Sequence, residues 1–138
     1  PGVYDIRVVN NDTSEDELAR AFEIERAFDC SLQRVQFDYD RSELTGSAQK
    51  ALEANAECIQ EKSYRSVRVE GHADERGSTE YNLALGQRRA ESVKKYLINL
   101  GVSGSVLRTI SYGEESPLTD GNGEVNWSKN RRAELIAE

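Results

Sequence analysis

A short stretch of the chain, residues 71–92, gathers most of the side chains that could do chemistry. It reads GHADERGSTEYNLALGQRRAES. An acid such as Asp74 can hold an ammonium group, and an arginine such as Arg89 can hold a carboxylate through two hydrogen bonds, so the combination suits a zwitterionic ligand. Gly71 is expected to let the chain turn sharply after a strand, and Gly77 to let it enter a helix. On spacing alone, solvated surface charges explain the pair more simply.

Catalysis is the first alternative for the same region. His72 is the only histidine, and the G-x-S-x-G pattern of a nucleophile elbow is absent, so a catalytic triad has little support. Asp74 or Glu75 could face Asp38 or Asp40 as the carboxylate pair of a glycosidase. In a chain with 25 acidic residues, however, such a pair is a weak signal. We therefore expect that the chain is not an enzyme.

Metal binding is the second alternative. One histidine and two distant cysteines do not supply an ordinary zinc site. The segment that starts at Asp38 imitates the first half of an EF-hand loop. It has Glu43 where such a loop needs glycine and Gln49 where it needs glutamate. We expect no metal and no cofactor.

Composition narrows the class of protein further. The 138 residues suit one domain, and a net charge of −7 argues against a nucleic-acid partner, because phosphate binding needs a basic surface. No apolar run approaches the roughly 20 residues that span a bilayer. The chain begins PGVYDIRVVNND, with neither an initiator methionine nor a signal sequence, which is typical of a cut or processed chain.

Periodicity predicts the elements that must position these residues. Apolar residues at spacings of three and four predict helices at residues 14–28, 45–62 and 78–100. Alternation of apolar and polar residues predicts strands at residues 34–40, 66–71, 105–113 and 131–137. A polar loop is expected at about 114–127. In it, Trp127 is expected to pack beside the final strand, and an exposed protein contact is the alternative.

The expected buried faces follow from the same patterns. In the first strand they are Val35, Phe37 and Tyr39. The helix at 45–62, capped by Thr45, should bury Ala48, Leu52, Ala56 and Ile59. The helix at 78–100, stopped by Gly101, should bury Leu83, Gly86, Ala90, Val93, Leu97 and Leu100.

The order of elements is βαβαββ, preceded by one helix. It predicts an α/β (α+β) two-layer sandwich with a mixed sheet, in which helical crossovers make the early strands parallel and the last strand can pair in either direction. We expect residues 1–33 to form an N-terminal arm and helix, and residues 34–138 to form the main domain.

Several separated motifs, in order, resemble the C-terminal domain of the OmpA-like family, and within it the peptidoglycan-associated lipoproteins. They are V-Q-F-D-Y-D, G-H-A-D-E-R-G-S-x-E-Y-N, L-G-Q-R-R-A-E-S-V, S-Y-G and S-K-N-R-R-A. The resemblance covers about residues 34–138. It implies non-covalent binding of the peptidoglycan stem peptide, chiefly its meso-diaminopimelate, by proteins that tether the outer membrane to the cell wall.

The resemblance also implies roles for individual residues. Asp74 would bind the ammonium group of diaminopimelate, and Arg89 its carboxylate. The residues expected to line or support the pocket are Asn82, Leu85, Asp38, Tyr39 and Asp40. Those expected to hold the surrounding loops are Phe37, Gly71, His72, Arg76, Gly77 and Arg131.

The cellular setting follows from the same resemblance. The domain would lie at the periplasmic face of the outer membrane of a Gram-negative bacterium, held there through a lipid anchor missing from this chain. A TolB-like periplasmic β-propeller is a second expected partner, as in a Tol-Pal system. The alternatives are the wall-binding domain of a porin or a flagellar stator and, from another class, a cell-wall hydrolase acting through Asp74 or Glu75.

The two cysteines, Cys30 and Cys58, allow two interpretations. A helix that follows a strand packs back along it, so Cys58 could approach Cys30 and form a disulfide. The periplasm that the resemblance implies would oxidise such a pair. Two buried thiols remain the alternative.

Overall fold

Four strands form the sheet of the protein in the computed structural model, which describes residues 30–119 and 121–138. They are β1 (Val35–Gln36), β2 (Val67–His72), β3 (Leu107–Gly113) and β4 (Arg132–Ala137). Their order across the sheet is β1-β4-β2-β3. β2 and β3 are parallel, whereas β4 runs antiparallel to both β1 and β2. The predicted mixed sheet is confirmed, with the last strand in its centre.

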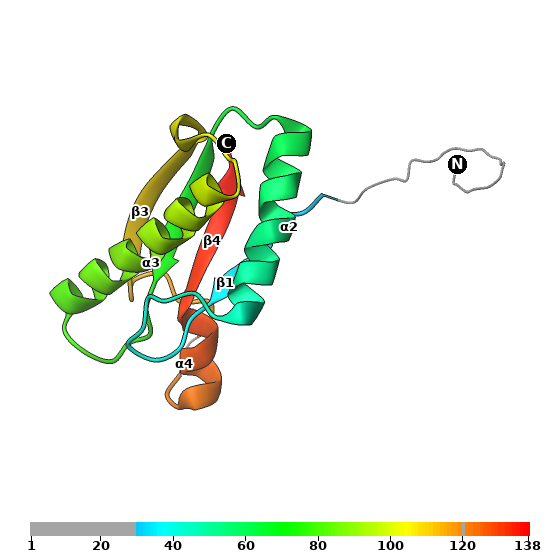
Figure 1. Cartoon of the computed structure of the whole chain (residues 1–138). Coiled ribbons are helices and arrows are strands. Elements are labelled where there is room, and N and C mark those ends of the chain that lie inside the picture. The colour runs from blue at the N-terminus through cyan, green and yellow to red at the C-terminus, as the bar shows by residue number, and fades with distance from the viewer. Residues whose placement is uncertain (1–29, 120) are drawn as a thin grey trace, which may run out of the picture. The chain divides into compact units, whose positions relative to one another are not determined.

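Two long helices, α2 (Gly46–Lys62) and α3 (Thr79–Asn99), cover one face of this sheet (Figure 1). The α+β sandwich with βαβαββ order is therefore confirmed, with one short helix added before β4. The helix predicted at 14–28 lies outside the described residues. Within the described part of the chain, every helix is too short or too polar to cross a membrane.

Helix α2 follows its sequence pattern closely. The Thr45 side chain accepts a hydrogen bond of 3.1 Å from the backbone N–H of Ala48, which satisfies one of the unpaired donors of the first turn. All four residues of the predicted core face are buried, namely Ala48, Leu52, Ala56 and Ile59. On the same helix, the buried Asn55 side chain exchanges two 2.8 Å hydrogen bonds with the backbone of Gln33. These bonds attach the segment before β1 to α2.

Helix α3 begins after Ser78, whose hydroxyl accepts a 3.1 Å hydrogen bond from Tyr81 N–H. It ends at Asn99, two residues before Gly101. Most of its predicted core face is buried, but Leu83 is 38% exposed, so that assignment was wrong. The physical reason is that the buried face of α3 at this end runs through Asn82, Leu85 and Arg89, and Leu83 points away from that face.

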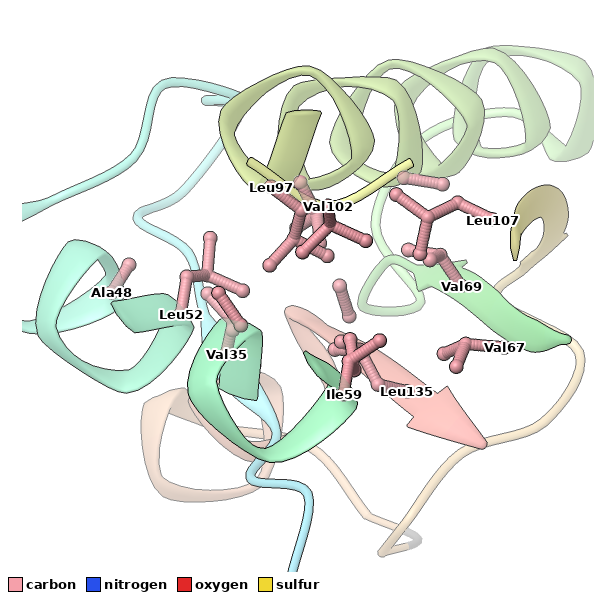
Figure 2. Close-up of a cluster of buried hydrophobic side chains, with 14 of the residues drawn as sticks. Val35, Ala48, Leu52, Ile59, Val67, Val69, Leu97, Val102, Leu107 and Leu135 are labelled. Carbon is pink, nitrogen blue, oxygen red and sulfur yellow. The ribbon is translucent and has the colours of Figure 1, made fainter. Parts of the chain in front are cut away.

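The hydrophobic core lies between these helices and the sheet. Figure 2 shows its centre, where Leu52 and Leu97 from the two helices meet Val35, Val69 and Leu135 from the strands. Each such side chain contributes about 1.5–3 kcal/mol when it is fully removed from water. The alternation of β2 places Val67 and Val69 in the core, as predicted.

Strand β1 is shorter than predicted. It covers only Val35–Gln36, and although Phe37 is buried, Tyr39 is 56% exposed. The chain leaves the sheet because Asp40 adopts a positive φ of 55° in a turn that Arg41 N–H closes on Asp38 O at 3.2 Å. The expected inward position of Tyr39 was therefore wrong.

The segment predicted as a loop at 114–127 contains the start of a helix, α4 (Glu124–Asn130). Trp127 therefore lies on a helix and not in a loop. The buried Asn130 side chain accepts a 2.8 Å hydrogen bond from Leu118 N–H and donates a 3.1 Å bond to Thr119 O. These bonds hold the preceding loop against the helix.

Gly71 and Gly86 set the distance between β2 and α3. A Cβ at Gly71 would lie 1.7 Å from the carbonyl oxygen of Gly86, and a Cβ at Gly86 would lie 2.3 Å from Ser111 Oγ. Gly71 does not adopt a positive φ. The expectation that it serves a sharp turn was wrong, because what requires glycine there is the contact between two backbones.

Candidate functional site

A small pocket of about 60 Å³ lies where three segments meet: the turn after β1, the loop after β2, and the first turns of α3. Most of its lining residues come from the charged stretch at residues 71–92, which was predicted to bind a ligand. Its lining residues are Tyr39, Asp40, Ala73, Asp74, Arg76, Gly77, Tyr81, Asn82, Leu85 and Arg89. No group of three or more His, Cys, Asp or Glu side chains among the described residues is arranged to hold a metal ion.

Arg89 forms the floor of this pocket. Its side chain is fully buried, and it donates hydrogen bonds to three backbone carbonyls, those of Arg41 at 2.8 Å, His72 at 2.8 Å and Asp38 at 3.1 Å. Burial lowers the pKa of Arg89 to about 10, so the guanidinium stays charged at neutral pH. The turn after β1 and the end of β2 thus hold a positive charge in place.

The Arg89 guanidinium retains donors for a ligand. It has five N–H groups, and three are used in the bonds to carbonyls. Among the described carboxylates, none lies at ion-pair distance from it. Asp74 and Asp40 stabilise this charge only at longer range, so the two remaining donors can receive an anion.

Asp74, only 4% exposed, provides the opposite charge. Its Oδ1 accepts hydrogen bonds from Arg76 N–H at 3.0 Å and Nε at 3.1 Å, and its Oδ2 accepts one from Arg76 Nη2 at 2.8 Å. Arg131 Nη1 lies 3.7 Å from Oδ2. Burial raises the pKa of Asp74, but the bonds from Arg76 outweigh it and hold the pKa below its ordinary value. The carboxylate is therefore ionised at neutral pH.

The Arg76 side chain lies between two aromatic rings. Its Cζ is 3.8 Å from the centroid of the Tyr39 ring and 4.0 Å from that of Trp127. Trp127 Nε1 donates a 2.9 Å hydrogen bond to Glu75. Trp127 was expected to pack beside the final strand, but α4 brings it to the loop after β2. The role of Trp127 at this site was not anticipated.

Tyr81 is a lining residue that sequence reasoning missed. Its hydroxyl donates a hydrogen bond to Asp40, which links α3 to the turn after β1. The signal was present in the sequence, because Tyr81, Leu85 and Arg89 are each four residues apart and share one face of the helix. Asn82 lines the pocket too, and its amide donates to Arg76 O at 3.0 Å.

The remaining predicted residues lie around the pocket. Asp38 contributes its backbone carbonyl to Arg89 and does not line the pocket. The buried Phe37 ring lies 5.2 Å below the Arg89 guanidinium, and Phe37 O accepts a 2.9 Å bond from Arg131. Gly77 adopts a φ of 102°, which favours glycine. Cys30 and Cys58 are each disulfide-bonded, so the alternative of two buried thiols was wrong.

The His72 ring lies in the interior and does not line the pocket. It is 1% exposed, stacks on Tyr112 with 5.5 Å between centroids, and has Nε2 at 3.3 Å from Glu70. Its Nδ1 has no hydrogen-bond partner among the described residues. Burial, followed by the charge of Arg132, lowers the pKa of His72 below 6.5. The folded protein thus keeps this ring neutral.

We expect this histidine to make stability depend on pH. At a pH below 6.5, the ordinary pKa of histidine, His72 takes up a proton in the unfolded chain more readily than in the folded chain. The free energy of unfolding therefore falls as the pH decreases from 7 to 5.5. The slope contributed by one group is at most about 1.4 kcal/mol per pH unit. Urea unfolding of the parent and of His72→Gln at several pH values tests this. Equal slopes for the two proteins would show that His72 plays no part.

Comparisons with known proteins identify relatives of this chain. A model of the OmpA family matches residues 36–131. The peptidoglycan-associated lipoprotein of Pseudomonas putida is 48% identical over 99 residues, 72% of this chain and 59% of that protein. The chain thus spans less than two thirds of that relative's length.

Solved structures of similar proteins match the fold of this chain. The crystal structure of the peptidoglycan-associated lipoprotein from Burkholderia pseudomallei matches with a TM-score of 0.73 and 39% identity, over 76% of this chain and 89% of that one. The C-terminal domain of Helicobacter pylori MotB matches with a TM-score of 0.70 and 26% identity, over 77% of this chain and 84% of that one. Because the family model matches most of its length, this chain belongs to the OmpA family.

Proposed function

We propose that this domain binds the peptidoglycan stem peptide without covalent chemistry, through the zwitterionic end of meso-diaminopimelate. The observation that carries the proposal is Arg89, a fully buried guanidinium on the pocket floor with two donors unused and no described carboxylate at ion-pair distance. It would bind the ligand carboxylate. The ionised Asp74, in the same pocket, would bind the ammonium group.

The wider role that we propose rests on the relatives. Proteins 48% and 39% identical to this chain are named peptidoglycan-associated lipoproteins. We infer that the full-length protein is anchored by a lipid in the outer membrane, lies on its periplasmic face, and tethers it to the wall. A TolB-like β-propeller is the proposed second partner, within a Tol-Pal-type system.

Two alternatives are less well supported. The first is the same wall-binding domain in a flagellar stator or a porin; the likeness to MotB, at 26% identity, is well below the 48% of the lipoprotein. A hydrolase acting through Asp74 or Glu75 would need one protonated carboxyl to serve as its general acid. The lowered pKa of Asp74 favours the charged form, which argues against Asp74 in that role and suits the binding of an ammonium group.

Co-sedimentation with purified sacculi tests the proposal. We expect the parent to pellet with sacculi that contain diaminopimelate and to stay in solution with sacculi that contain lysine at that position. Asp74→Asn keeps the shape but removes the charge, and should weaken binding about 10- to 100-fold, as for the loss of a hydrogen bond to a charged group. Glu53→Gln, the same change at an exposed position on α2, is the matched control.

Each outcome of this experiment has one meaning. If the folded parent stays in solution with both kinds of sacculi, the wall-binding proposal is wrong. If soluble muropeptides accumulate with time and Asp74→Asn stops their release, the protein is a hydrolase.

A further inference from the structure

The carboxylate proposed to bind the ligand's ammonium group is already occupied by a cation of the protein itself. Arg76 binds both oxygens of Asp74 through its side chain, at 3.1 Å to Oδ1 and 2.8 Å to Oδ2. Arg76 also lines the pocket, so its guanidinium stands where a ligand cation must arrive. An ammonium group therefore has to displace it, at least in part.

The backbone and the side chain of Arg76 are held in different ways. Its N–H donates to Asp74 at 3.0 Å and its carbonyl accepts from Asn82 at 3.0 Å, so the loop is fixed by bonds that do not involve the guanidinium. The guanidinium itself is held by Asp74 and by the rings of Tyr39 and Trp127. The side chain can therefore leave Asp74 while the loop stays in place.

Those two rings also reduce the cost of displacement. Cation–π contacts with Tyr39 and Trp127 are independent of the Asp74 carboxylate, and about 28% of the Arg76 side chain faces solvent. A guanidinium pushed from Asp74 keeps both an aromatic surface and access to water. By contrast, Arg89 is fully buried and fixed by three carbonyls, so the anion-binding end of the pocket does not move.

We propose that Arg76 is an internal competitor for the cationic end of the ligand, and that it lowers the affinity of the pocket for every stem peptide whose ammonium group must reach Asp74. The proposal rests on the proposed function of the pocket. A lysine side chain brings only a cation, and exchanging one cation for another at Asp74 yields little free energy. A diaminopimelate end also brings a carboxylate. The hydrogen bonds of this carboxylate to Arg89 supply the binding free energy that the exchange of cations at Asp74 does not.

Calorimetric titration with two synthetic stem peptides tests this. The peptides are identical except for meso-diaminopimelate or L-lysine at the third position. The variant Arg76→Gln removes the competing charge but keeps an N–H donor for Asp74. Arg65→Gln, at an exposed arginine beyond α2, makes the same change of charge away from the pocket.

We expect Arg76→Gln to bind the lysine peptide about tenfold more tightly than the parent does, as for the loss of one competing charge-assisted contact. The diaminopimelate peptide should gain by a similar factor, because displacing Arg76 from Asp74 costs the same free energy for both ligands. Arg65→Gln should leave both dissociation constants unchanged. Circular dichroism of each variant verifies that it is folded.

Two outcomes would overturn the inference while the proposed function stands. In the first, the parent binds the diaminopimelate peptide and Arg76→Gln weakens both peptides, which would make Arg76 a ligand contact or a support. In the second, Arg76→Gln binds both peptides with the same dissociation constants as the parent. If the parent binds neither peptide, the proposed function fails first, and the competitor role fails with it.

Discussion

Replacing Gly71 with alanine is expected to lower the free energy of unfolding by about 3 kcal/mol or more, at the upper end of the range for overpacking. The new Cβ would lie 1.7 Å from the carbonyl oxygen of Gly86, which is backbone and cannot rotate away. Helix α3 must move off β2 to make room. Urea denaturation of the parent and the variant measures the effect.

Gly46→Ala is the matched control for this substitution. A Cβ at Gly46 meets nothing within 4 Å, and the residue opens helix α2, so alanine there should raise the free energy of unfolding by about 0.5–1 kcal/mol. Because α3 carries Asn82, Leu85 and Arg89, Gly71→Ala should also weaken ligand binding. Equal stability of Gly71→Ala and the parent would contradict the close approach of the two backbones.

Replacing Arg89 with methionine is expected to weaken ligand binding at least about 100-fold, the effect of truncating one partner of a buried charge pair. Stability should change much less. Methionine leaves three carbonyls without their donor, at about 1–3 kcal/mol each, and the low end applies to those of Asp38 and Arg41, which are exposed residues that water can reach. The substitution also removes a buried charge, whose burial is unfavourable. The lowering of the Arg89 pKa from 12.5 to about 10 corresponds to a cost of about 3 kcal/mol for that burial. The two terms are of similar size and opposite sign.

Calorimetry with the diaminopimelate peptide, together with urea denaturation, separates these effects. A variant that loses binding but unfolds near the parent's midpoint would show that Arg89 is retained for the ligand. If Arg89→Met is destabilised as strongly as Gly71→Ala, its main role is to hold the turn after β1 to the end of β2. Should it still bind as the parent does, the carboxylate of the ligand does not reach Arg89.

The sequence alone was sufficient for the elements whose signals are local. Thr45 and Ser78 cap the two long helices through bonds to residues three positions on, and alternation in β2 buries Val67 and Val69. The mixed sheet followed from the order of these elements. Most of the pocket residues were also identified, but through the motifs shared with a known family. Nothing in the spacing of Asp74 and Arg89 requires them to meet.

Tertiary structure decided the rest, because those features depend on residues far apart in the chain. The requirement for glycine at position 71 comes from the backbone of α3, and the early end of β1 comes from the turn at Asp40. Trp127 reaches Arg76, 51 positions before it in the sequence, only because α4 folds beside the loop after β2. Periodicity reports which face of an element is apolar, whereas contacts between loops depend on how several elements pack together. The geometry on which the proposed competition at Asp74 rests therefore becomes visible only in the folded protein.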